Sequence, residues 1–272
     1  PKDKHDLVRL NDEYGRSKKA YEGEEFEKLK SGNDLWLKDP EIGKSNEYEF
    51  SGCSLKIENI DNWSFDLDNT LYPEDTNLFA RVSKRMTVFI QKEFNLEEEP
   101  ARDLQRKMFK QYGTTMRGLM TEYDMDPENF LHFVHDIDVS DMQVDMELKD
   151  LLGKLPGRRF IYTNGSVAHA KNITSQLGIE NLFEDVFDIV ASNFLPKPAP
   201  QPYDDMVIKF SADPTRSVMI EDMAKNLRPA ADLGMMTVWL RHNKDWSSED
   251  SEGDHIHYAI DDLKLWLKEI IN

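Results

Sequence analysis

The chain has 272 residues, with 34 Lys and Arg against 52 Asp and Glu, and carries a net charge of −18 at pH 7. An excess of negative charge on this scale argues against non-specific binding to nucleic acid or to an anionic membrane surface. Cys53 is the only cysteine, which excludes an intrachain disulfide and favours a reducing, cytoplasmic environment.

Length and hydropathy limit the architecture further. A chain of this length can hold one α/β domain and a smaller second domain. No apolar run approaches the ~20 residues that a membrane-spanning helix needs, and the N-terminus has no secretory signal pattern. Because the sequence begins at Pro1 without a Met, we expect it to be a processed product or a fragment.

Residues 1–58 differ in composition from the rest of the chain. They are rich in Lys, Glu, Asp, Asn and Gly and have only short periodic stretches. We expect an N-terminal extension that is partly disordered or packs on the surface, with a helix at 24–30 and a strand at 47–57.

A short apolar run after this extension ends in two carboxylates. The run contains Ile60, Trp63 and Phe65, and Asp66 and Asp68 follow directly. If the run is a strand, both side chains lie in the loop at its end and converge on one ligand. Neighbouring carboxylates raise each other's pKa, and a divalent cation such as Mg²⁺ removes that conflict. The simpler alternative is an acidic turn after an edge strand.

Residues 74–150 have a helical pattern. Apolar residues three or four apart form the stripes of amphipathic helices: Leu78, Val82, Met86, Phe89, Ile90, Leu104, Met108, Phe130, Phe133 and Val134. Asn95, Gly113 and Pro127 mark the breaks between these helices. We expect an all-helical insertion of about eighty residues.

From residue 151 onward, strands and helices alternate. Strands are expected at 160–163, 186–191, 217–220, 236–240 and 256–260, and helices at 167–177, 203–210 and 263–271, with one more ending near Gly234. Continuous apolar runs that alternate with helices predict a parallel sheet covered on both faces. The predicted fold is an α/β, doubly wound parallel sheet built from 59–73 and 151–272, with the helical domain 74–150 inserted after its first strand.

Polar residues follow four of the expected strands, where ligands bind in such sheets. After Asp66 and Asp68 come Thr163, Asn164 and Gly165, then Lys197 in a proline-rich loop, then Glu221, Asp222 and Asn226. Taken singly, a Thr-Asn-Gly turn or a loop lysine has no functional meaning. Together and in this order, they predict a site for phosphate and Mg²⁺.

The pattern D-x-D-x-T-L-Y, then T-N-G, K-P and E-D-x-x-x-N, resembles the haloacid dehalogenase-like (HAD) hydrolases over residues 58–265. The resemblance implies that Asp66 is the nucleophile, which forms an aspartyl-phosphate, and that Asp68 is the general acid and base. It implies Mg²⁺ held by Asp66, the backbone carbonyl of Asp68, and Asp222, with Glu221 and Asn226 in support. It also implies that Thr163, Asn164, Gly165 and Lys197 bind the phosphate.

Residues 112–118, 134–138 and 163–170 are similar to the bacterial pyrimidine 5′-nucleotidase branch of that superfamily. This similarity implies a helical C1-type cap and a small-molecule substrate, a nucleoside 5′-monophosphate. Tyr112, Thr114, Thr115 and Arg117 are the candidate base contacts, unless their segment only links two cap helices. Ser64 departs from the family, whose first strand is normally apolar, and its buried hydroxyl is costly unless it is hydrogen-bonded.

Several alternatives stay open. A haloalkanoate dehalogenase shares the Asp66 chemistry but needs neither an acid at position 68 nor Mg²⁺. A phosphomutase, or a phosphatase of sugar phosphates, uses the same residues, whereas a non-catalytic binding module would not need them all. The histidines lack zinc-ligand spacing, and His135 and His169 are expected to be structural or to face the cap. The sequence does not predict an oligomeric state.

Overall fold

The structure is a computed structural model that describes residues 56–242, 244 and 246–272. The expected helix at 24–30 lies outside the described residues, as does the expected strand at 47–57 except for its last two residues. Of these two, Ile57 begins a 3₁₀ helix, η1 (Ile57–Asn59). No helix in the described ranges is both long and apolar enough to cross a membrane.

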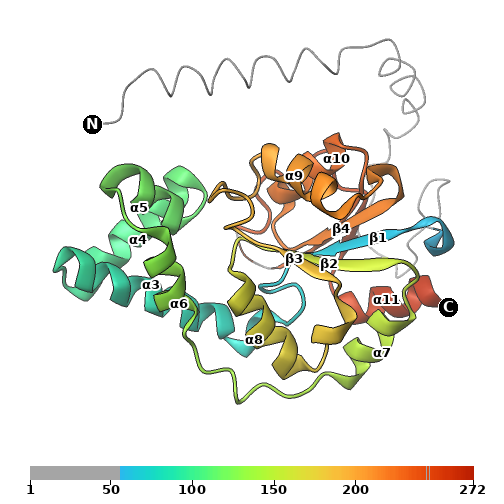
Figure 1. The fold of residues 1–272 in the computed structure, drawn as a ribbon, viewed down its shortest axis with the longest axis horizontal. Coiled ribbons are helices and arrows are strands. Elements are labelled where there is room, and N and C mark those ends of the chain that lie inside the picture. The colour runs from blue at the N-terminus through green and yellow to red at the C-terminus, as the bar shows by residue number, and fades with distance from the viewer. Residues whose placement is uncertain (1–55, 243, 245) are drawn as a thin grey trace, which may run out of the picture. The chain divides into compact units, whose positions relative to one another are not determined.

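The described residues form one parallel sheet of six strands (Figure 1) in the order β3-β2-β1-β4-β5-β6. The chain moves outward from β1 in one direction and then resumes on the other side at β4. The doubly wound prediction is therefore confirmed, and β1 and β4 flank the switch point where ligands bind in such sheets. The strands are β1 (Asn62–Phe65), β2 (Arg158–Tyr162), β3 (Asp185–Phe187), β4 (Ser217–Glu221), β5 (Met236–Leu240) and β6 (Tyr258–Ile260).

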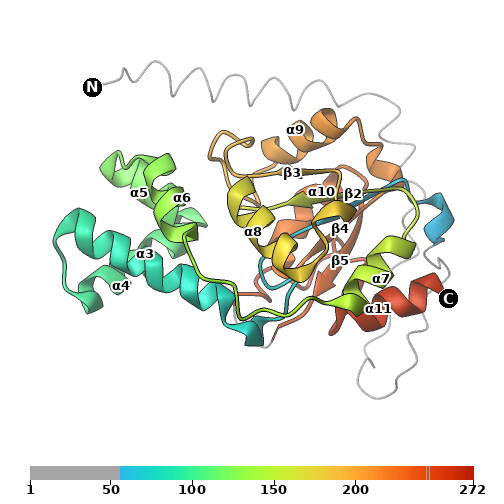
Figure 2. The same ribbon diagram turned by 60° about the horizontal axis from the view of Figure 1, so that its bottom comes forward.

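Helices cover both faces of the sheet (Figures 1 and 2). One face carries α7 (Met146–Lys154), α8 (Val167–Leu177) and α11 (Leu263–Ile271), and the other carries α9 (Gln201–Phe210) and α10 (Arg228–Asp232). Short 3₁₀ helices complete the connections: η2 (Glu74–Thr76), η3 (Glu180–Leu182), η4 (Pro214–Arg216) and η5 (Ala224–Leu227).

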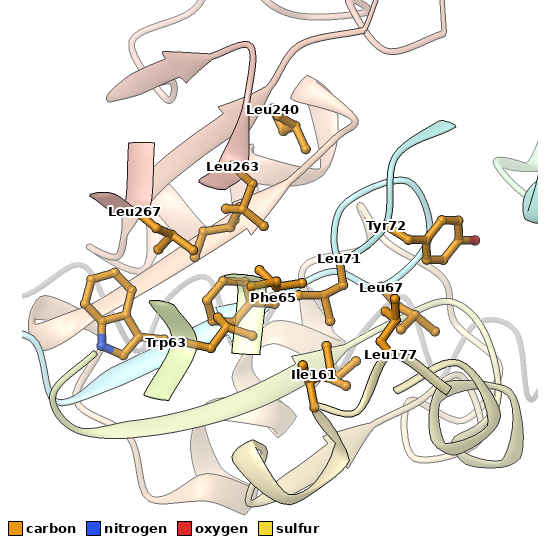
Figure 3. Packing of buried hydrophobic residues seen from close by; sticks show 14 of the residues in the cluster. Trp63, Phe65, Leu67, Leu71, Tyr72, Ile161, Leu177, Leu240, Leu263 and Leu267 are labelled. Atoms are coloured by element: carbon orange, nitrogen blue, oxygen red, sulfur yellow. The ribbon is translucent and has the colours of Figure 1, made fainter. Parts of the chain in front are cut away.

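Strand β1 is buried along its whole length because both faces of the sheet are covered. Trp63 and Phe65 belong to the cluster beneath α11, where Figure 3 shows them with Leu263 and Leu267. On the opposite face, the Ser64 hydroxyl lies 3.8 Å from the Met206 sulfur on α9, which gives the polar group one weak acceptor.

Helices α3 (Leu78–Phe94), α4 (Glu98–Tyr112), α5 (Thr115–Tyr123) and α6 (Pro127–His135) follow β1, and we call them the helical insertion. They bury an apolar cluster of their own, distinct from the clusters on the sheet, whereas the buried leucines of α7 pack with the sheet. At Gly118, a Cβ would lie only 2.6 Å from the Met108 Cβ. The absent side chain therefore lets α5 approach α4 closely.

The expected strand at 186–191 is wrong beyond Phe187. The Asp188 carboxylate accepts hydrogen bonds from the backbone N–H groups of Val167 and Ala191, and these bonds bend the chain into a turn. The loop that follows packs Ile189 and Phe194 against the apolar cluster of the helical insertion. It continues directly to Lys197.

Candidate active site

Asp66 lies directly after β1, and its backbone N–H extends the sheet by donating to the Ile220 carbonyl at 2.9 Å. Its side chain is buried, with 6 % of the residue exposed. Oδ1 accepts a hydrogen bond from the Lys197 ammonium at 2.7 Å, and Oδ2 accepts one from the Thr70 hydroxyl at 3.2 Å. Both carboxylate oxygens are therefore held at the end of the strand.

The Lys197 ammonium is buried and makes three hydrogen bonds. It donates to Asp66, to Glu221 Oε2 at 2.5 Å and to the Tyr162 carbonyl at 3.0 Å. Burial lowers the pKa of Lys197, but the two carboxylates raise it further, so that the net shift is upward and the group stays charged. The Lys197–Pro198 peptide bond is cis.

Asn164 holds the lysine loop in place. Its Oδ1 accepts the backbone N–H of Lys197 at 2.9 Å, which joins the loops after β2 and β3. Nearby, the Thr163 hydroxyl oxygen accepts the N–H of Gly165 at 2.9 Å. A Cβ on Gly165 would lie only 3.2 Å from that hydroxyl oxygen, so the turn can be this tight because residue 165 has no side chain. The loop then enters α8, whose N-terminal N–H groups favour an anion.

Asp66, Glu221 and Asp222 form a buried cluster in which the candidate ligand oxygens all lie within 4.8 Å of one another. Among the described residues, Lys197 is the one ammonium that pairs with this cluster, so two negative charges are uncompensated when all three carboxylates are ionised. Burial and the neighbouring Glu221 raise the pKa of Asp66 to about 7 and hold the pKa of Asp222 well above its usual range.

This donor set fits a hard divalent cation, which prefers carboxylate oxygens and would balance both charges. Asn226 adds a further oxygen acceptor, because its buried Oδ1 has no hydrogen-bond partner within the described part of the chain. Asn69 donates to Asp222 Oδ2 at 3.4 Å and orients that carboxylate. Glu221 is thus part of the acidic cluster as well as a partner of Lys197.

Asp68 has two partners that the sequence did not reveal. Its Oδ1 accepts hydrogen bonds from the Tyr72 hydroxyl at 2.5 Å and from Nε2 of His169 at 2.9 Å. Burial raises the pKa of Asp68, but His169 and Tyr72 outweigh this effect and lower the pKa to about 2. The His169 ring stacks on His135, with ring centroids 4.3 Å apart and an angle of 15° between the planes.

A cavity of about 470 Å³ opens above these groups and is lined by both the sheet loops and the helical insertion. Thr114 and Thr115 line it, but Tyr112 and Arg117 do not, and the Tyr112 hydroxyl instead donates to Glu122. Most other lining residues of the insertion are apolar: Phe79, Ala80, Val82, Met86, Phe109, Met116, Phe130, Leu131 and Val134. A larger cavity of about 580 Å³, near Val144 and Lys264, is lined in part by Tyr72 but by none of the carboxylates of the site.

A curated protein is similar to this chain in sequence. Phosphate metabolism protein 8 of Saccharomyces cerevisiae is 25 % identical over 187 residues, which are 63 % of this chain and 58 % of that protein. The chain therefore spans less than two thirds of this curated relative.

Solved structures show the same fold. The HAD phosphatase from Thermococcus onnurineus matches with a TM-score of 0.55 and 18 % identity, over 78 % of this chain and 98 % of that one. The magnesium-bound HAD hydrolase YfnB from Bacillus subtilis has a TM-score of 0.51 at 14 % identity, with the same coverage. An L-2-haloacid dehalogenase from Xanthobacter autotrophicus also reaches 0.51, at 12 % identity and the same coverage, so the fold alone does not separate the two chemistries.

The family profile described as haloacid dehalogenase-like hydrolase matches residues 61–234. This span runs from the start of β1 to the turn before β5 and so includes the acidic cluster, Lys197 and the helical insertion. The chain belongs to the haloacid dehalogenase-like hydrolases.

Proposed function

We propose that the protein is a Mg²⁺-dependent phosphomonoester hydrolase that acts through an aspartyl-phosphate on Asp66. The observation that carries this proposal is the buried cluster of Asp66, Glu221 and Asp222 around one lysine, at the switch point of the sheet. Mg²⁺ bound there would neutralise the carboxylates and polarise a phosphoryl oxygen. A dehalogenase has no need of this excess of carboxylates or of an acid at Asp68.

In the first step, a carboxylate oxygen of Asp66 attacks phosphorus in line, and the ester P–O bond breaks. Asp68 gives a proton to the leaving oxygen, while Lys197 and the N–H groups after Thr163 hold the phosphoryl oxygens as charge develops on them. Asp68 is ionised in the free site, and it takes up a proton from the solvent when the substrate binds, because the phosphate dianion beside it raises its pKa by like-charge repulsion. It can then act as the acid.

In the second step, water attacks the phosphorus of the aspartyl-phosphate and Asp68 takes its proton. The bond between Asp66 and phosphorus breaks, which releases inorganic phosphate, restores the Asp66 carboxylate and leaves Asp68 protonated for the next ester. The same residue therefore serves as acid and then as base, and the cycle needs no other reactant than water.

The substrate in this proposal is a pyrimidine nucleoside 5′-monophosphate. A mostly apolar cavity with a few polar groups suits a flat base whose edge is read by hydrogen bonds. Thr114 and Thr115 are the polar candidates from the segment similar to nucleotidases, and both line the cavity. Tyr112 and Arg117 are not supported as base contacts, because neither residue lines the cavity.

Phosphate release from p-nitrophenyl phosphate tests the proposed phosphatase activity, and phosphate release from a panel of nucleotides tests the proposed pyrimidine preference. Asp66→Asn should release phosphate at less than a tenth of the wild-type rate while its thermal unfolding stays cooperative. Halide release from a 2-haloacid without phosphate release would replace the phosphatase by a dehalogenase. UMP and CMP should have higher kcat/KM than AMP and GMP, and equal values would reject the pyrimidine preference alone.

A further inference from the structure

The Asp68 carboxylate is held by one of its two oxygens. Both donors, the Tyr72 hydroxyl and His169 Nε2, reach Oδ1, at 2.5 Å and 2.9 Å. Among the described residues, none donates a hydrogen bond to Oδ2. The side chain is 19 % exposed and lines the cavity above Asp66, so Oδ2 is the oxygen left free to bond with a group in that cavity.

The two donors are themselves fixed. Tyr72 is 1 % exposed, and its ring belongs to the apolar cluster that Figure 3 shows around Leu67 and Leu71. His169 is also 1 % exposed and lies on the first turn of α8, where its backbone N–H donates to the capping residue Ser166 at 3.2 Å.

Contacts from the helical insertion fix the ring of His169 as well. His135, the last residue of α6, stacks on that ring, and its Nδ1 lies 2.9 Å from the Ser166 hydroxyl oxygen. Nδ1 of His169 is buried and has no hydrogen-bond partner among the described residues, and Nε2 is the nitrogen that donates, toward the Asp68 carboxylate. The ring is therefore held by its hydrogen bond to Asp68 Oδ1 and by its stacking on His135.

We propose that Tyr72 and His169 are positioning residues that hold Asp68 by Oδ1 and reserve Oδ2 for proton transfer. This inference rests on the phosphatase function proposed above. A general acid acts only within hydrogen-bond reach of the leaving oxygen, and a carboxylate free to turn spends much of its time outside that reach. With both donors on Oδ1, the side chain keeps one orientation while Oδ2 gives up a proton and takes one back.

A leaving-group series separates positioning from a purely structural role. p-Nitrophenyl, phenyl and p-methylphenyl phosphate have similar shapes, but only nitrophenolate leaves readily without a proton. The parameter to measure is kcat/KM, because it reports the transfer to Asp66 and not the later hydrolysis. General acid catalysis contributes about 10²–10⁴-fold, so we expect His169→Leu to lose about 10²-fold on phenyl phosphate and Tyr72→Phe about tenfold. On p-nitrophenyl phosphate, each should lose less than about threefold, because that step needs little acid.

Two further variants act as controls. His169→Gln keeps an N–H donor near the position of Nε2 and should recover part of the loss on phenyl phosphate. Thr174→Val removes another buried polar group from α8, a hydroxyl bonded only to its own helix, and should leave the whole series unchanged. The unfolding midpoints of all variants check that α8 stays folded. If His169→Leu does not fold, Tyr72→Phe, which keeps its aromatic ring, tests the positioning role alone.

Equal losses of Tyr72→Phe on all three aryl phosphates, or no loss on any, would overturn the inference. Failure of the proposed function has a different signature. The wild type would then release no phosphate from any of the esters, or Asp66→Asn would release it at the wild-type rate. A steeper dependence on the leaving group in both donor variants, with partial recovery in His169→Gln, supports the positioning role.

Discussion

Lys197→Met is the substitution that tests the charge balance of the site most directly. The change keeps most of the buried volume but removes the ammonium that pairs with two of the three buried carboxylates, Asp66 and Glu221. It also removes three hydrogen bonds, at 2.5, 2.7 and 3.0 Å. Breaking a buried ion pair by deleting one partner costs about 3–5 kcal/mol, and we expect a loss of this size in the free energy of unfolding without metal.

Denaturant unfolding in EDTA at pH 8 measures this loss, with Lys209→Met as the matched control. The Lys209 ammonium also pairs with a carboxylate, that of Asp185 at 2.9 Å, but both side chains are more than a third exposed. Such a pair contributes about 0–1 kcal/mol. Added Mg²⁺ should stabilise Lys197→Met more than the wild type, because it supplies the missing positive charge. A loss for Lys197→Met no larger than that for Lys209→Met would refute the proposed charge balance.

Three other outcomes are expected. EDTA should stop phosphate release and added Mg²⁺ should restore it, whereas full activity in metal-free buffer would contradict a metal-dependent mechanism. Removing residues 1–55 should leave kcat/KM within about threefold, since the proposed catalytic residues lie between 66 and 222, and a folded but inactive truncation would show otherwise. Gly118→Ala should lower the free energy of unfolding by about 1–3 kcal/mol, because its Cβ would lie 2.6 Å from the Met108 Cβ. The control Gly153→Ala, also helical but with nothing within 4 Å of its Cβ, should be neutral or stabilising by up to about 1 kcal/mol.

Much of the fold could be predicted because local signals agreed with the tertiary structure. The helix predicted at 167–177 is confirmed, and it ends where Gly178 takes a left-handed conformation with φ of 75°. The strand at 236–240 and the helix at 263–271 are confirmed as well. The strand predicted at 186–191 is wrong over 188–191, because an aspartate that accepts backbone hydrogen bonds from Val167 and Ala191 cannot be told from any other aspartate in a sequence.

In the candidate site, the sequence indicated which loops matter but not how they interact. The partners Asp68 and His169 are 101 residues apart, and Asn164 binds the backbone of a residue 33 positions later. Contacts of this kind depend on which strands are neighbours, and β1 lies next to β2 only because of the doubly wound order. A histidine on the first turn of the helix after β2 was the one available signal for its contact with Asp68.

The loop between β3 and α9 restricts which helical insertions could replace the one in this protein. Its Ile189 and Phe194 are part of the packing of the helical insertion, and three residues later the same loop provides Lys197 to the acidic cluster. The two chain connections between the helical insertion and the sheet, before α3 and after α6, are the evident junctions for exchanging the insertion. In this chain a third junction exists, so a graft would need to carry a matching 189–194 segment. Without it, the new insertion would leave a void beneath the loop that carries Lys197.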